Sequence, residues 1–205
     1  AGITLGAFHS GEFEGLWSRF PGLKILYPAT AQETFEALVA GFYDPNPCLV
    51  LEHKLLYWTQ ESDIDFDGNL DAVFHPRRYR EGTDLTVVAF GAMVQSACAA
   101  IDRSGYTADV WNPFILVPSV LKPILESVEK TGRLVVVQES NRLAGLGDHL
   151  VSQVVESAFR HLKCEPHVVA ACQTPVPFAR ELEAHYIPDP GRIQRSIVNL
   201  MESSS

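Results

Sequence analysis

The chain has 205 residues, of which 46% are apolar, so we expect a globular protein with a buried core. Its 25 acidic and 16 basic residues give a formal charge of −9, and the basic residues are scattered. We therefore expect neither a nucleic acid nor a membrane as a partner, and no apolar run approaches the roughly 20 residues of a membrane-spanning helix. The four cysteines form no C-x-x-C pair, which predicts free thiols in a reducing compartment, the cytoplasm or an organelle matrix.

The first predicted unit is a strand, a helix and a second strand. The run LKILY at 23–27 predicts a strand, and Thr30 followed by Glu33 is typical of a capping box at a helix start. The apolar residues of this helix recur on one face, at Phe35, Leu38, Val39 and Phe42. After the helix, CLVLE at 48–52 is a continuous apolar run, which predicts a strand buried on both faces of a parallel sheet.

A linker and a longer alternation of strands and helices follow. Residues 61–81 are polar, first acidic and then basic, without periodicity, so we place an interdomain linker there. This divides the chain into domains 1–60 and 82–205. In the second domain strands are expected at 85–90, 106–111, 134–139 and 167–171, and helices after Gly91, from Ser119, at 148–162 and at 192–201. The pattern predicts an α/β fold with mainly parallel sheets covered by helices.

The glycine-containing segment AGLGDHL raises the possibility of a dinucleotide site, because it lies between a predicted strand and a predicted helix. The full motif needs a third glycine, and Leu150 stands in its place. We therefore interpret Gly145 and Gly147 as turn residues.

Two short segments carry candidate site residues. His9 lies between Gly6 and Gly11 and precedes an acidic pair, which suits proton transfer or recognition of an anion, although a surface histidine is the alternative. In GFYDPNP, Asp44 and Asn46 offer oxygen ligands for a hard cation after a helix end. The same residues would also make a plain turn.

Several motifs together resemble one known family. They are HSGEFEGLW, PGLKILYP, DPNPCLVLEHKLLY, GTDLTVVAFGAMVQSACAAI, GRLVVVQES, GLGDHL, TPVPF and YIPD. From His9 to Met201 the sequence is similar to the beta subunit, or the beta-like half of a fused chain, of the thiamine-diphosphate-dependent decarboxylating component of 2-oxoacid dehydrogenase complexes, in the transketolase superfamily.

The resemblance implies the rear part of a transketolase-type pyrimidine-binding domain in 1–60 and a transketolase C-terminal domain in 82–205. It implies an N-terminally truncated relative, because the family's glutamate that protonates the cofactor lies further upstream. The intact enzyme uses thiamine diphosphate and Mg²⁺ to decarboxylate a 2-oxo acid oxidatively and to pass the acyl group to lipoyl-lysine. We expect this chain alone to be inactive and not to bind the cofactor.

The resemblance also implies site residues and partners. His9 would be the active-site histidine, which stabilises the thiamine adduct or guides acyl transfer. Asp44 and Asn46, with the carbonyl of Gly41, would match a structural K⁺ site. Expected partners are an alpha-type subunit or half, a second copy that forms a homodimer through the C-terminal domain, and the lipoyl acyltransferase core.

Three positions depart from the family pattern, at Gly11, at Trp111 to Phe114 and at His149. Gly11 replaces a glutamine, the segment with Pro113 replaces an Asp-Leu-Arg-Thr pattern, and His149 replaces a glutamate. Two alternatives stay open: a non-catalytic module for assembly or regulation, and another thiamine-dependent transferase or oxidoreductase. Pyruvate and branched-chain substrates both remain candidates.

Overall fold

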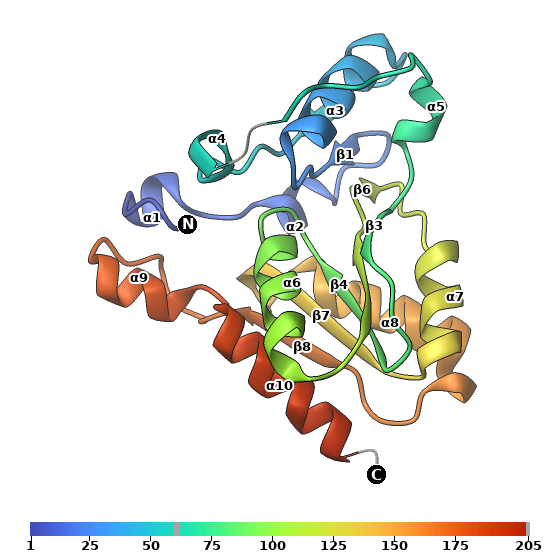
Figure 1. Cartoon of the computed structure of the whole chain (residues 1–205). Helices are drawn as coiled ribbons and strands as arrows, with labels where there is room; N and C mark the ends of the chain where they lie inside the picture. Colours follow the sequence, from blue (N-terminus) through green and yellow to red (C-terminus); the bar gives the residue numbers. More distant parts are fainter. Residues whose placement is uncertain (60–61, 204–205) are drawn as a thin grey trace.

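The computed structural model describes residues 1–59 and 62–203, and these residues form two β-sheets with helices packed against them (Figure 1). The smaller sheet has the strand order β2-β1-β6, and the larger has the order β3-β5-β4-β7-β8. The expected α/β class is confirmed. Within the described residues no helix is long and apolar enough to span a bilayer.

The predicted strand-helix-strand unit forms much of the smaller sheet. Strand β1 (Lys24–Leu26) leads to α3 (Ala31–Tyr43) and returns to β2 (Cys48–Val50), which pairs parallel with β1. The hydroxyl of Thr30 accepts a hydrogen bond from the Glu33 amide at 3.1 Å, as the capping box predicts. The Glu33 carboxylate instead bonds the Ala29 amide, one residue before the cap.

Strand β2 corrects one expectation. Its residues are only half-buried, whereas the sequence predicted burial on both faces. The reason is its place in the sheet, because β2 is an edge strand and pairs with β1 alone.

Two pairings cross the expected domain boundaries. Strand β6 (Ile115–Val117) follows β5 (Ala108–Asn112), the third strand of the larger sheet along the chain, yet it pairs antiparallel with β1 and completes the smaller sheet. Strand β3 (Arg77–Arg80) lies inside the range expected to be linker, and it pairs antiparallel with β5. The division into 1–60, 61–81 and 82–205 remains a proposal, and the segment 61–81 contains regular structure.

The larger sheet is mainly parallel, as expected. Strands β4 (Leu85–Ala89), β5 (Ala108–Asn112), β7 (Leu134–Asn141) and β8 (His167–Ala171) pair parallel, and only β3 at the edge runs antiparallel. All five residues of β4 are buried, which explains why four of them are apolar; the fifth is Thr86.

Helices cover both faces of the larger sheet (Figure 1). On one face lie α6 (Met93–Ser104) and α10 (Pro190–Ser203); on the other lie α7 (Lys122–Thr131) and α8 (Leu146–Ala158). Helix α7 begins three residues later than Ser119, with Pro123 in its first turn, and α8 continues into a 3-10 turn, η1 (Phe159–His161).

The sequence did not predict the short helices. They are α1 (Gly6–His9), α2 (Glu14–Trp17), α4 (Leu56–Thr59), α5 (Leu70–Val73) and α9 (Arg180–Tyr186). Helices of four to seven residues show too little periodicity to be recognised, and tertiary contacts stabilise them.

Candidate functional site

A hollow of about 330 Å³ lies between the N-terminal segment and the residues that follow β2. Its lining includes His9, Glu12 and Phe13 from one side, and Tyr27 and His53 from the other. The hollow therefore combines titratable groups with aromatic rings, and the expected active-site histidine belongs to it.

His9 is the last residue of α1 and is exposed. The ammonium of Lys54 donates a hydrogen bond to the His9 carbonyl at 2.8 Å, and the Ser10 amide bonds the Gly6 carbonyl at 3.1 Å. These contacts hold the backbone of the loop and leave the imidazole accessible. The catalytic role of His9 stays a prediction.

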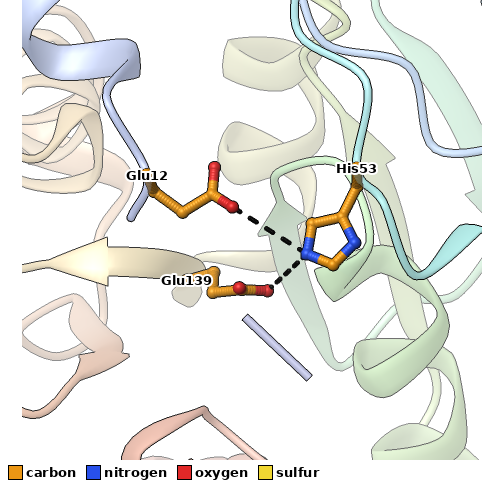
Figure 2. Close-up of side chains that lie close together, drawn as sticks. All are labelled: Glu12, His53 and Glu139. Atoms are coloured by element: carbon orange, nitrogen blue, oxygen red, sulfur yellow. Dashed lines mark hydrogen bonds and ion pairs between the residues drawn. The ribbon is translucent and has the colours of Figure 1, made fainter. Parts of the chain in front are cut away.

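Behind the hollow lies a buried cluster of Glu12, His53 and Glu139 (Figure 2). Figure 2 shows the His53 imidazole facing both carboxylates. Its Nε2 lies 2.9 Å from Oε2 of Glu139 and 3.8 Å from Oε1 of Glu12. Three distant segments meet here: the loop between α1 and α2, the segment after β2, and the strand β7. The α-amino group of Ala1 also donates a hydrogen bond to Glu139.

Burial acts to raise the pKa of both carboxyl groups of the cluster, and their different neighbours give them different acidities. Burial and the neighbouring charge of Glu139 raise the pKa of Glu12 to about 7, although Tyr27 donates to its Oε2 at 2.7 Å. Burial also acts to raise the pKa of Glu139, but the hydrogen bond and charge of His53, together with the Ala1 amino group, outweigh it and lower that pKa. Glu14, next to the cluster, is buried, and this burial raises its pKa.

The candidate K⁺ residues are brought together in part. Oδ1 of Asp44 accepts hydrogen bonds from the amide of Asn46 at 2.8 Å and from its side-chain nitrogen at 3.1 Å. The Lys24 ammonium donates to Oδ2 of Asp44 and holds the pKa of that carboxyl below its usual value. Gly41 packs against the side chain of Cys48. The carboxylate is thus paired with a cationic side chain, and the K⁺ site remains a proposal.

Gly145 and Gly147, which the sequence predicted to be turn residues, both pack closely against Gln138. A Cβ on Gly145 would lie 2.0 Å from the side-chain nitrogen of Gln138, and one on Gly147 would lie 2.4 Å from its oxygen. The Gly147 amide donates to that oxygen at 2.6 Å. Gly145 is the N-cap of α8, whereas Gly147 lies in the first turn of that helix, so the interpretation as a turn residue is wrong for Gly147. The close packing of both glycines against Gln138 does not favour a dinucleotide site.

The departures from the family pattern have different surroundings. A Cβ at Gly11 would meet the ring of Phe13 at 2.8 Å, and His149 is exposed on α8. In the segment before Pro113, Asn112 is fully buried and donates to the carbonyl of Tyr27 and the carboxylate of Glu33, both at 3.1 Å. This amide therefore joins the two sheets.

Sequence reasoning did not single out His53 and Glu139. A usable signal existed, because each lies at or just beyond the carboxyl end of a predicted apolar strand, where site residues of α/β sheets gather. Glu12 was noticed only as part of an acidic pair.

Comparisons with known proteins agree with this architecture. The family model described as "Transketolase, C-terminal domain" matches residues 76–193. Among solved structures, a chain titled "Split gene transketolase, inactive beta4 tetramer" superposes with a TM-score of 0.71 at 20% identity, over 93% of this chain and 61% of that one. This likeness concerns the fold.

Curated relatives extend the similarity over nearly the whole sequence. The acetoin:2,6-dichlorophenolindophenol oxidoreductase subunit beta of Cupriavidus necator is 34% identical over 94% of this chain and 58% of its own. The mitochondrial pyruvate dehydrogenase E1 component subunit beta of Saccharomyces cerevisiae is 31% identical over 98% of this chain and 57% of its own length. The pyruvate dehydrogenase E1 component subunit beta of Bacillus subtilis is 31% identical over 92% of this chain and 58% of its own length.

The chain spans somewhat more than half the length of these relatives. The match to the family model covers more than half of the chain itself, and the beta-subunit relatives extend it to the segment that carries His9. The chain belongs to the transketolase C-terminal domain family and is a relative of the beta subunits of 2-oxoacid dehydrogenase E1 components.

Proposed function

We propose that this chain is the beta-type part of a thiamine-diphosphate-dependent 2-oxoacid dehydrogenase component. The intact enzyme decarboxylates a 2-oxo acid oxidatively and transfers the acyl group to lipoyl-lysine. The observation that carries the proposal is the similarity to pyruvate dehydrogenase beta subunits over 92 to 98% of the chain, which takes in His9 and the hollow.

His9 is the residue we propose for the chemistry. Its imidazole is exposed at the hollow while Lys54 and the turn of α1 hold its backbone. An accessible histidine on a held loop is suited to transfer a proton to or from a bound substrate.

The hollow fits one wall of a thiamine diphosphate site and not a complete one. The rings of Phe13 and Tyr27 suit the aromatic portion of the cofactor. The diphosphate does not fit, because the carboxylates of Glu12 and Glu52 line the hollow and Lys54 is the only lysine or arginine among the described lining residues. We therefore assign the diphosphate and its Mg²⁺ to an alpha-type partner.

A second substrate class follows from one relative. The Cupriavidus necator protein, with 34% identity, is named for acetoin and for the acceptor dichlorophenolindophenol. Acetoin therefore stands beside pyruvate and branched-chain 2-oxo acids as a candidate. A homodimer through the C-terminal domain and docking to a lipoyl acyltransferase core complete the proposal.

The test is an activity assay on the polypeptide that contains these residues, purified together with an alpha-type subunit and supplied with thiamine diphosphate and Mg²⁺. Dichlorophenolindophenol reduction is followed with pyruvate, a branched-chain 2-oxo acid and acetoin. We expect turnover of one of them, and we expect His9→Ala to lower kcat by about 100-fold or more.

The exposed His149 on α8, which does not line the hollow, provides a matched control. His149→Ala should leave kcat unchanged. No turnover of any of these substrates by the assembled protein, or equal activity in His9→Ala and His149→Ala, would contradict the proposal.

A further inference from the structure

Buried carboxyl groups are concentrated around the cluster behind the hollow. Three carboxylates, on Glu12, Glu14 and Glu139, lie at this point, and Glu14 and Glu139 are only 2% and 4% exposed. The opposite charges that face them are the imidazole of His53 and the α-amino group of Ala1. Charges in such surroundings are costly unless they are paired or bind a metal ion.

The geometry of the cluster suits one ion. One ligand atom from each of Glu12, His53 and Glu139 lies within 4.8 Å of the others. Ligand atoms that bind a single ion at about 2.1 Å are about 3 to 4 Å apart, so small side-chain shifts are sufficient. One imidazole nitrogen with carboxylate oxygens is a ligand set for a divalent transition ion such as Zn²⁺ or Mn²⁺.

The surroundings already orient these ligands. The Tyr27 hydroxyl donates to Oε2 of Glu12 at 2.7 Å, which leaves Oε1 directed at His53. Such a hydrogen bond to a ligating carboxylate is characteristic of metal sites.

One observation outside the three ligands also points to a cation. Glu14 lies beside Glu12 and Glu139, and its buried Oε2 makes no hydrogen bond of normal geometry among the described residues, although the nearby Ser140 hydroxyl acts to lower the pKa of this carboxyl group.

We propose that Glu12, His53 and Glu139 form a binding site for one divalent transition metal ion. The ion ties the loop between α1 and α2 and the segment after β2 to strand β7. Its role is structural: it fixes the back wall of the hollow. This proposal is independent of the reaction that the intact protein performs.

The test uses the untagged 205-residue chain, stripped with EDTA and dialysed. Calorimetric titration with ZnCl₂ and, separately, MnCl₂ should give binding of one ion per chain for at least one of them. At a hundredfold excess over Kd the thermal midpoint should rise by about 5 °C or more.

Glu12→Gln keeps the size of the side chain and should lower the affinity at least about tenfold, and His53→Gln should abolish binding. His149→Gln replaces an exposed histidine outside the cluster and should bind as the unmodified chain does. If His53→Gln fails to fold, Glu12→Gln still tests the proposal. The side chain of Glu12 is 16% exposed, against 3% for His53, so its substitution should disturb the fold less.

A version with two residues added before Ala1 converts the amino group to an amide. Because a competing positive charge is removed, this version should bind the ion at least as tightly. Absence of saturable binding to the stripped chain, unchanged affinity in Glu12→Gln, or loss of binding in the extended version would overturn the proposal.

Discussion

The two sheets differ in how completely this chain covers them. The strands of the larger sheet are sandwiched between α6 and α10 on one face and α7 and α8 on the other, and β4 and most of β7 are buried. Around the smaller sheet and the N-terminal segment, large apolar side chains remain exposed, namely Phe8, Phe13, Leu16, Trp17, Phe20, Leu38, Phe42, Tyr43, Tyr57 and Trp58.

This difference indicates that the larger sheet provides most of the stability, whereas the proposed function is located at the smaller sheet and the N-terminal segment. Burial of apolar surface is the main stabilising contribution, so the larger sheet should dominate the free energy of unfolding. Exposed apolar patches of this kind characterise interaction surfaces, which supports the proposal that a partner covers the region of the hollow.

The largest loss in the free energy of unfolding is expected from a substitution that creates a cavity in the larger sheet. Leu134 on β7 is completely buried, and Leu134→Ala should lower the free energy of unfolding by about 3 kcal/mol. Phe42→Ala removes a ring that is 82% exposed and should change the free energy of unfolding by less than about 0.5 kcal/mol. Urea denaturation measures both, and equal losses would refute the comparison.

A second effect is expected at a buried carboxylate of the larger sheet. Asp109 on β5 accepts hydrogen bonds from the Gly82 amide at 3.0 Å, the Ser127 hydroxyl at 2.7 Å and the Lys130 ammonium at 2.5 Å. Asp109→Asn should cost about 2 kcal/mol at pH 7, because buried donors lose a charged acceptor while the half-exposed Lys130 adds little.

The cost of Asp109→Asn should depend on pH. Burial acts to raise the pKa of Asp109, but its donors outweigh this effect and hold the pKa below the usual 3.8. A lowered pKa in the folded state contributes stability above the unfolded pKa, and this contribution disappears as the pH falls through the folded value. The difference between the two proteins should therefore be constant from pH 7 to 5 and shrink below about pH 4. A difference that grows on acidification would disprove this assignment.

A smaller loss of stability is expected from a substitution at the contact between the N-terminal segment and the loop that precedes α8. A Cβ on Gly15, in α2, would lie 2.0 Å from the carbonyl oxygen of Ala144. Gly15→Ala should lower the thermal midpoint, at a cost of about 1.5 kcal/mol, because a backbone must move. A Cβ on Gly191, in α10, would meet side-chain atoms only, Oδ1 of Asp189 at 3.1 Å and a guanidinium nitrogen of Arg195 at 3.6 Å, so Gly191→Ala should be neutral or slightly stabilising. A neutral Gly15→Ala would show that the contact is loose.

The smallest effect is expected at an exposed ion pair. Arg142 and Asp148 are 64% and 40% exposed, with a nitrogen–oxygen distance of 2.9 Å. Arg142→Ala should change stability by less than about 0.5 kcal/mol, and added salt should reduce even that difference. A loss above 1 kcal/mol in the free energy of unfolding, measured by the same denaturation assay, would contradict the assignment of this ion pair as a weak surface interaction.

The two sheets were not equally predictable from the sequence. The mainly apolar segments Leu-Thr-Val-Val-Ala in β4 and Leu-Val-Val-Val at the start of β7 are typical of buried parallel strands, so their place in the fold followed from local pattern. Strand β3 reads Arg-Arg-Tyr-Arg, a sequence that predicts a linker, because an edge strand tolerates charged side chains that hide the strand pattern. Strand β6 was missed because its pairing with β1 joins residues about 90 positions apart, which no local signal reports.

The candidate site shows the same limit. His9 and the residues Asp44 and Asn46 stood out within single short segments. The cluster of Glu12, His53 and Glu139 depends on three segments, and the last two residues are 86 positions apart in the sequence. Only the folded chain brings their side chains together.

The most direct measurement is calorimetric titration with thiamine diphosphate and Mg²⁺, first of this chain alone and then of the chain assembled with an alpha-type subunit. The proposed function predicts no saturable binding to the chain alone and one cofactor for each assembled pair, because the diphosphate does not fit the acidic hollow. Tight binding to this chain alone would contradict the assignment of the cofactor site to a partner, and no binding by the assembly would contradict the proposed function itself.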